Sequence, residues 1–149
     1  MSVTKERSES SWDCRFLKLC QEISAWSKDP STKVGAVIVD ESHRIISTGY
    51  NGLPRGIDDS HERLSDRETK LAITLHAEQN AILFANTDLT GCTLYCTHHP
   101  CAHCAATIVQ SGITRVVMCK ENLLGDHWRP SEQLAKEIFN EANVMLGTL

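Results

Sequence analysis

Two short motifs combine residues that bind metals with a residue that can move protons. Glu78 follows His76 by two positions, and Cys101 and Cys104 lie three positions apart directly after Pro100. Cysteines at this spacing at the start of a helix project from one end of it and can bind one ion. Two thiolates and one imidazole leave the fourth tetrahedral position open, which is typical of catalytic zinc. We therefore predict one Zn²⁺ per chain on these three ligands, with Glu78 as the base for a zinc-bound water whose pKa falls toward about 7.

The other cysteines lack this arrangement. Free cysteine behaves as a small apolar side chain when buried, so we interpret five of the seven as packing residues: Cys14, Cys20, Cys92, Cys96 and Cys119. A second metal site formed by the last three is the alternative. A zinc-stabilised binding module without catalysis is a further alternative, and Glu78 is the residue that separates it from an enzyme.

Alternating strand and helix patterns must position the two motifs. Helical spacing predicts helices from a cap at Ser10 or Ser11 to Pro30, from Leu75 to Gly91, from Pro100 to Gly112, and from Pro130 onward. Apolar or alternating runs predict strands at 34–39, 45–48, 93–97, 115–119 and 144–146. This order predicts an α/β fold, a three-layer α/β/α sandwich with a mixed sheet of about five strands. We expect one domain over residues 1–149, with residues 1–10 frayed.

Residues 57–71 carry mixed charge without a clear period. A loop of this length in a compact domain is usually functional or mobile. A solvated face that includes a short helix is the other interpretation, and the sequence leaves both open.

Composition excludes several classes of protein. The 149 residues carry a net charge of −4 and 5% aromatic residues, and the isoelectric point is about 5.9. Proteins that bind polynucleotides use basic grooves and aromatic stacking platforms, so we expect no polynucleotide partner. The longest apolar run is too short to cross a membrane, and the polar N-terminus does not read as a secretory signal. We therefore expect a cytoplasmic protein without a membrane partner.

The sequence resembles the deoxycytidylate (dCMP) deaminases of the cytidine deaminase-like superfamily, from about Trp12 to Val144. The pair H-x-E and P-C-x-x-C is the signature of zinc-dependent nucleobase deaminases and gives the chemistry. The dCMP branch is indicated by a Gly-Tyr-Asn-Gly loop together with His-Ala-Glu-Gln-Asn-Ala. The segments that carry the resemblance are 29–36, 49–52 with Pro54, 76–81, 100–104 and 111–113.

The resemblance implies hydrolytic deamination of dCMP to dUMP and ammonia, which supplies thymidylate synthesis. Glu78 would take a proton from the attacking water and pass protons to N3 of the base and to the leaving ammonia. The backbone N–H of Ala77 would donate to the pyrimidine O2, and Asn51 would bind the sugar hydroxyl.

A nucleoside monophosphate also requires cationic or hydrogen-bonding partners for its phosphate. Our candidates are Lys33, Ser31 and Thr32, with Arg55 next, and a solvated loop position is the alternative for each. His99 is expected to line the site. Many relatives stack a Tyr on the base, and the corresponding segment here has none. Trp128 or His127 is the candidate to take its place, and a plain packing role is the equal alternative for both.

Relatives of this type are homohexamers that dCTP activates together with Mg²⁺ and that dTTP inhibits. By resemblance, the effector site would lie near the Gly-Tyr-Asn-Gly loop at a subunit contact and use Gly52, Arg55 and Phe84. The remaining alternative within the superfamily is a deaminase of free cytidine, of tRNA adenosine or of single-stranded DNA, and the acidic composition with few aromatic residues disfavours the two polynucleotide substrates.

Overall fold

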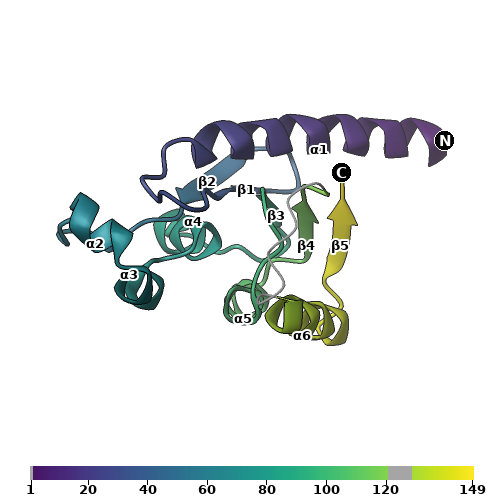
Figure 1. Ribbon diagram of the computed structural model, residues 1–149. Helices are drawn as coiled ribbons and strands as arrows, with labels where there is room; N and C mark the ends of the chain where they lie inside the picture. The colour runs from purple at the N-terminus through teal and green to yellow at the C-terminus, as the bar shows by residue number, and fades with distance from the viewer. Residues whose placement is uncertain (1, 121–128) are drawn as a thin grey trace.

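A mixed sheet of five strands forms the centre of the molecule. The computed structural model describes residues 2–120 and 129–149 of the 149-residue chain. The strands lie in the order β2-β1-β3-β4-β5. They are β1 (Gly35–Val39), β2 (Ile45–Tyr50), β3 (Thr93–Cys96), β4 (Arg115–Met118) and β5 (Met145–Thr148) (Figure 1).

Strand direction decides which loops meet at each edge of the sheet. β1 is antiparallel to both β2 and β3, whereas β3, β4 and β5 are parallel. Ala36 pairs with Cys96, and Gly35 pairs with Tyr50. The start of β1 and the ends of β2 and β3 therefore lie at the same edge, and the segments that enter or leave these strands gather there.

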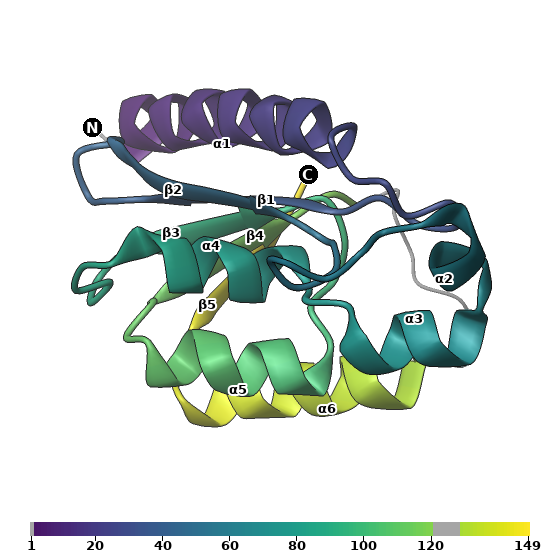
Figure 2. The same ribbon diagram turned by 90° about the vertical axis from the view of Figure 1, so that its left-hand side faces the viewer.

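Helices cover both faces of this sheet. α1 (Ser2–Ser24) lies along one face, and α4 (Ala77–Ala85), α5 (Ala102–Gln110) and α6 (Arg129–Glu141) lie along the opposite face (Figure 2). Two short helices, α2 (His61–Ser65) and α3 (Arg67–Ile73), precede α4. The predicted three-layer α/β/α sandwich with a mixed five-stranded sheet is confirmed.

The two faces of the sheet build two apolar clusters. All five residues of β1 are buried, as expected for a strand covered on both sides. Ile38 and Leu94 point into the cluster beneath α4, α5 and α6. Val37 and Tyr95 point the other way, into the cluster beneath α1. Because alternate side chains face opposite layers, β1 and β3 hold the helix layers in fixed positions.

Three local predictions differ from the structure. The first helix begins at Ser2, not at a cap at Ser10 or Ser11, so its helical span includes residues 2–10. The same helix ends at Ser24, well before Pro30, and Cys14 on it is exposed instead of buried.

The segment 57–71 contains helices, in agreement with the second of our two interpretations. Ser60 caps α2 by accepting a hydrogen bond from the Arg63 N–H, at 3.3 Å. Asp66 caps α3 by accepting one from the Thr69 N–H, at 3.4 Å. None of the helices among the described residues is both long and apolar enough to cross a membrane.

Candidate active site

Two helices of the same layer begin at one point at the edge of the sheet. His76 is the residue that precedes α4, and Cys101 is the residue that precedes α5. The backbone N–H of His76 donates to Gln79 Oε1 at 2.9 Å, and the N–H of Ala102 donates to Ser131 Oγ at 2.9 Å. Because the N-terminus of a helix carries a partial positive charge, this meeting point favours thiolate over thiol.

The three predicted metal ligands lie together. His76 Nδ1 is 3.5 Å from Cys101 Sγ and 3.2 Å from Cys104 Sγ, and the three ligand atoms lie within 4.8 Å of one another. Zinc in tetrahedral geometry with ordinary bond lengths would separate such a nitrogen and sulfur by about 3.6 Å. Both cysteines are buried. The donor set and its spacing therefore fit zinc, and Nδ1 is the histidine nitrogen that would bind it.

Hydrogen bonds within the cluster favour a thiolate at Cys101 and leave protons on Cys104 and His76. A hydrogen bond from Cys104, followed by one from His76, lowers the pKa of Cys101 to about 4 even though burial opposes this. The same hydrogen bond between the two cysteines raises the pKa of Cys104, and burial and the nearby Glu78 raise it further. The hydrogen bond to Cys101 is the largest cause that raises the pKa of His76. A cation bound here would displace these protons.

Glu78 lies in the first turn of α4, beside the ligand cluster. Glu78 is only 4% exposed. A carboxylate is rarely buried without partners, so its contacts matter. Cys96 is the last residue of β3, and its thiol donates a hydrogen bond to Glu78 Oε1 at 2.8 Å. Ala77, between His76 and Glu78, is fully buried. A buried carboxylate next to a metal site is placed to act as a general acid and base.

Residues 10–120 match the family model described as the cytidine and deoxycytidylate deaminase zinc-binding region. The chain belongs to this deaminase family. A deaminase from Aliivibrio fischeri, described as an uncharacterized deaminase in the luxG 3′ region, is 46% identical over 91% of both chains. Human deoxycytidylate deaminase is 34% identical over 97% of this chain and 83% of its own length.

The fold of this deaminase also resembles solved structures. The dCMP deaminase from the cyanophage S-TIM5, in complex with dCMP and dUMP, superposes with a TM-score of 0.73 and 25% identity. The superposition covers 91% of this chain and 94% of the phage chain. The family match and the ligand cluster together make the site of this deaminase a zinc site.

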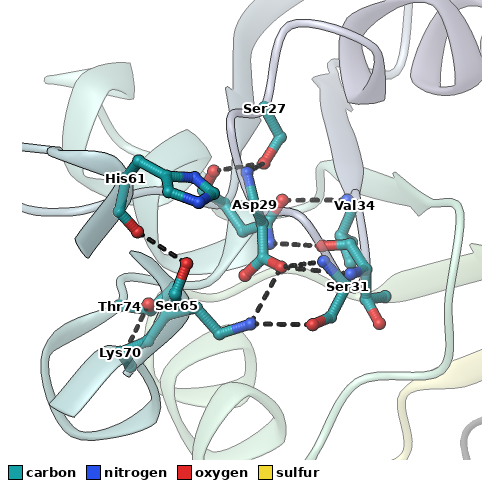
Figure 3. A network of polar contacts seen from close by, with 10 residues as sticks. Ser27, Asp29, Ser31, Val34, His61, Ser65, Lys70 and Thr74 are labelled. Carbon is teal, nitrogen blue, oxygen red and sulfur yellow. Dashed lines mark hydrogen bonds and ion pairs between the residues drawn. The ribbon is translucent and has the colours of Figure 1, made fainter. Parts of the chain in front are cut away.

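The loop that leads into β1 is fixed by a buried ion pair (Figure 3). Lys70 of α3 donates to Asp29 Oδ1 and to Ser31 Oγ, both at 3.1 Å. Asp29 Oδ1 also accepts from the backbone N–H of Ser31 at 2.8 Å and of Thr32 at 3.1 Å. These contacts leave the side chains of Ser31, Thr32 and Lys33 exposed at the edge of the sheet where the metal ligands lie.

Asn51 follows β2 and holds the same loop from the other side. Its Oδ1 accepts from the Val34 N–H, and its Nδ2 donates to the Thr32 carbonyl, both at 2.9 Å. Ser27 Oγ in turn donates to the Asn51 carbonyl at 2.8 Å. The side chain expected to bind a sugar therefore also orders the loop that carries the predicted phosphate ligands, and each of its two polar atoms still has capacity for one more hydrogen bond.

The remaining predicted site residues are His99 and the candidates for stacking on the base. His99 is within 3.1 Å of Glu132 on α6, through Nδ1 and Oε1. Burial is the largest influence on His99 and lowers its pKa. Trp128 and His127 lie outside the described residues, so the expected stacking partner is not placed.

Two of the three predicted effector residues, Arg55 and Phe84, contact each other. The guanidinium of Arg55 lies over the ring of Phe84, 5.5 Å from its centre. Gly52 exchanges two backbone hydrogen bonds with Leu75, at 2.8 and 3.1 Å. Gly52 and Arg55 also line a pocket of about 280 Å³ together with Trp26 and other residues of the neighbouring loops.

Two residues with clear roles in this geometry did not emerge from the sequence. Lys70 stands in a stretch of mixed charge and Cys96 among cysteines interpreted as packing. The burial of Cys96 is as expected, but its contact with Glu78 is not. No local pattern marks either residue, because each acts on a partner from another element of the fold.

Proposed function

We propose that this chain catalyses zinc-dependent hydrolytic deamination of dCMP to dUMP and ammonia. The observation that carries the proposal is the cluster of His76, Cys101 and Cys104 with the buried carboxylate of Glu78 beside it. The similarity to human deoxycytidylate deaminase and to a dCMP deaminase solved with dCMP and dUMP supports this choice of substrate.

The chemistry assigns separate tasks to the residues. When bound, zinc supplies a Lewis acid that makes a water molecule nucleophilic near neutral pH. Glu78 accepts the proton of the water that attacks C4 of the cytosine ring. It then delivers protons to N3 and to the amino group that leaves as ammonia. The N–H of Ala77, in the first turn of α4, donates to the pyrimidine O2.

The phosphate and sugar are assigned to the neighbouring loops. Lys33 supplies the positive charge for the phosphate, with the hydroxyls of Ser31 and Thr32 as further partners and Arg55 next. Asn51 binds the sugar hydroxyl. Support comes from the sheet topology, because the start of β1 and the end of β2 lie at the edge where the metal ligands gather. We assign His99 and Trp128 to the lining of the site.

We further propose that residues 1–149 form a single domain, that copies of this domain assemble, and that nucleotides regulate the assembly. The chain acts as a homohexamer, with dCTP and Mg²⁺ as activator and dTTP as inhibitor. Gly52, Arg55 and Phe84 serve the effector site. Support comes from the pocket at the Gly-Tyr-Asn-Gly loop, which Gly52 and Arg55 line, and from the contact of Arg55 with Phe84. One zinc per chain and a cytoplasmic location complete the proposal.

An ultraviolet assay of deamination tests the substrate. The zinc-loaded protein is given dCMP, CMP, deoxycytidine or dCTP at matched concentrations, and kcat/KM is compared. We expect dCMP to be preferred over deoxycytidine by at least about tenfold, the effect of one lost charged hydrogen bond. Equal rates on dCMP and deoxycytidine would refute recognition of the phosphate. Addition of dCTP with Mg²⁺, or of dTTP, tests regulation, which fails if neither changes the rate.

A further inference from the structure

A buried thiol contacts the general acid–base residue from the side of the sheet. Cys96 Sγ lies 2.8 Å from Glu78 Oε1. Cys96 is fully buried at the end of β3, and Glu78 belongs to the first turn of α4. The contact therefore joins a strand and a helix through two residues that are 18 positions apart in the sequence. A strand fixed by pairing on both sides is a rigid anchor for a carboxylate.

The thiol of Cys96 remains a donor under working conditions. Burial raises its pKa well above the ordinary value, and the charge of Glu78 and the hydrogen bond to it raise it further. Glu78 is also close to the thiol of Cys104. As a zinc ligand, however, Cys104 is a thiolate and has no proton to donate. In the metal-loaded site, Cys96 is therefore the neutral sulfur that can hold the carboxylate.

We propose that Cys96 is a positioning residue for Glu78. Its thiol occupies Oε1, fixes the rotation of the carboxylate and leaves Oε2 for the proton that moves between water, N3 and the leaving group. A thiol is a weak hydrogen-bond donor. It can therefore orient the carboxylate and still leave it basic enough for the first proton transfer. This inference rests on the proposed deaminase mechanism, but the contact itself can be tested without a substrate.

Three substitutions separate orientation from packing. Cys96→Val fills nearly the same space without a donor, and Cys96→Ala removes the donor and some volume. Cys96→Ser keeps a donor. Cys92→Val is the matched control, because Cys92 is also buried and flanks the opposite end of β3. For each variant, zinc content, thermal unfolding, kcat and KM are measured on the best substrate of the wild-type protein.

We expect Cys96→Val and Cys96→Ala to bind one equivalent of zinc and to lose about tenfold in kcat with little change in KM, the effect of one hydrogen bond to a charged group. Cys96→Ser should recover most of this loss, and Cys92→Val should match the wild type. Wild-type kcat in Cys96→Val would overturn the proposal. A loss in Cys96→Ser as large as that in Cys96→Val would do the same, because it would mean that only packing matters.

Vibrational spectroscopy gives a readout that is independent of turnover. Hydrogen bonding to a carboxylate should move one S–H stretching band of the zinc-loaded protein to lower frequency. This band should be absent from Cys96→Val and should move upward in Glu78→Gln, where the acceptor is neutral. A band that is unchanged in Glu78→Gln would overturn the proposal. These results hold whatever the substrate proves to be, so they separate a failure of this inference from a failure of the proposed function.

Discussion

Lys70 Nζ lies 3.1 Å from Asp29 Oδ1, and the two side chains are only 4% and 10% exposed. The pair connects α3 with the loop that enters β1, which carries the predicted phosphate ligands (Figure 3). Lys70 also donates to Ser31 Oγ. An ammonium group can only donate, so the Ser31 oxygen must accept and its own proton is left to donate elsewhere. A buried ion pair of this kind is better regarded as a device that fixes geometry than as a source of stability.

Lys70→Met should leave the Asp29 carboxylate buried without its cation. Breaking a buried pair from one side costs about 3–5 kcal/mol in the free energy of unfolding. Because the loop also loses its anchor, the KM for dCMP should rise more than kcat falls. Urea unfolding and steady-state kinetics measure both. Lys28→Met is the control, since the ion pair of Lys28 with Asp59 is on the surface and its loss should change little. Equal changes in the free energy of unfolding and in KM for the two substitutions would contradict a special role of the buried pair.

The same pair predicts a dependence of stability on pH. Burial alone would raise the pKa of Asp29, but the N–H groups of Ser31 and Thr32 and the ammonium of Lys70 together lower it below 3.8. An acid with a lowered pKa stabilises the fold above its unfolded-state pKa and loses that contribution as pH falls through the folded value. The difference in free energy of unfolding between wild type and Asp29→Asn should therefore be constant near pH 6 and shrink below about pH 3.8. A difference that stays the same down to pH 2.5 would exclude this linkage.

Much of the site was predictable because its parts are local. Cys101 and Cys104 lie in one helical turn, and His76 and Glu78 lie in another, so spacing alone places each pair correctly. The three layers and the five-stranded sheet follow from the alternation of helical and strand patterns, whereas the order of the strands was not predicted. The contact of Lys70 with Asp29 spans 41 residues and depends on how α3 packs, which no periodicity encodes.

The start of α1 was missed for a related reason. Its first nine residues lack the apolar stripe that marks a packed helix, so a cap at Ser10 or Ser11 was the natural boundary. A helix that is already nucleated can extend beyond its apolar stripe, because each added residue forms one more hydrogen bond without a new nucleation step. Patterns of burial therefore locate the part of a helix that contacts the core better than they locate its end.

Glu78→Gln should separate metal binding from catalysis. The amide is nearly the same size and is not a ligand, so the protein should still bind one equivalent of zinc. Loss of the proton shuttle should lower kcat by at least about 10²-fold, the range for general acid–base catalysis. Zinc analysis and ammonia release on the same preparation give the two values. Full activity in this variant would remove Glu78 from the mechanism.

Removal of zinc should abolish activity and reduce thermal stability. Without the metal, the two thiols and the imidazole share protons with one another and with Glu78, and the bonds to the metal that tie α4 to α5 are lost. Dialysis against a chelator should eliminate turnover, and added Zn²⁺ should restore it. His76→Ala should prevent this recovery, whereas Cys14→Ser, at an exposed cysteine on α1, should not affect it. Undiminished turnover in metal-free protein would contradict a catalytic zinc.

Gly49 is required for the close approach of α4 to β2, and this contact sets the position of the active site. A Cβ atom at Gly49 would overlap the Ala77 carbonyl oxygen and would lie 2.5 Å from the Ala81 backbone nitrogen. These are backbone atoms of the helix that begins at the metal, so relief requires α4 to move.

Gly49→Ala should therefore cost about 1–3 kcal/mol of stability through overpacking, and it should also lower zinc affinity, because His76 moves with the helix. Gly147→Ala is the control, since a Cβ there meets only Val117 side-chain atoms, at 3.7 and 3.9 Å. Thermal unfolding and zinc titration of both variants check the prediction. Wild-type zinc affinity in a destabilised Gly49→Ala would show that α4 adjusts without moving its first turn.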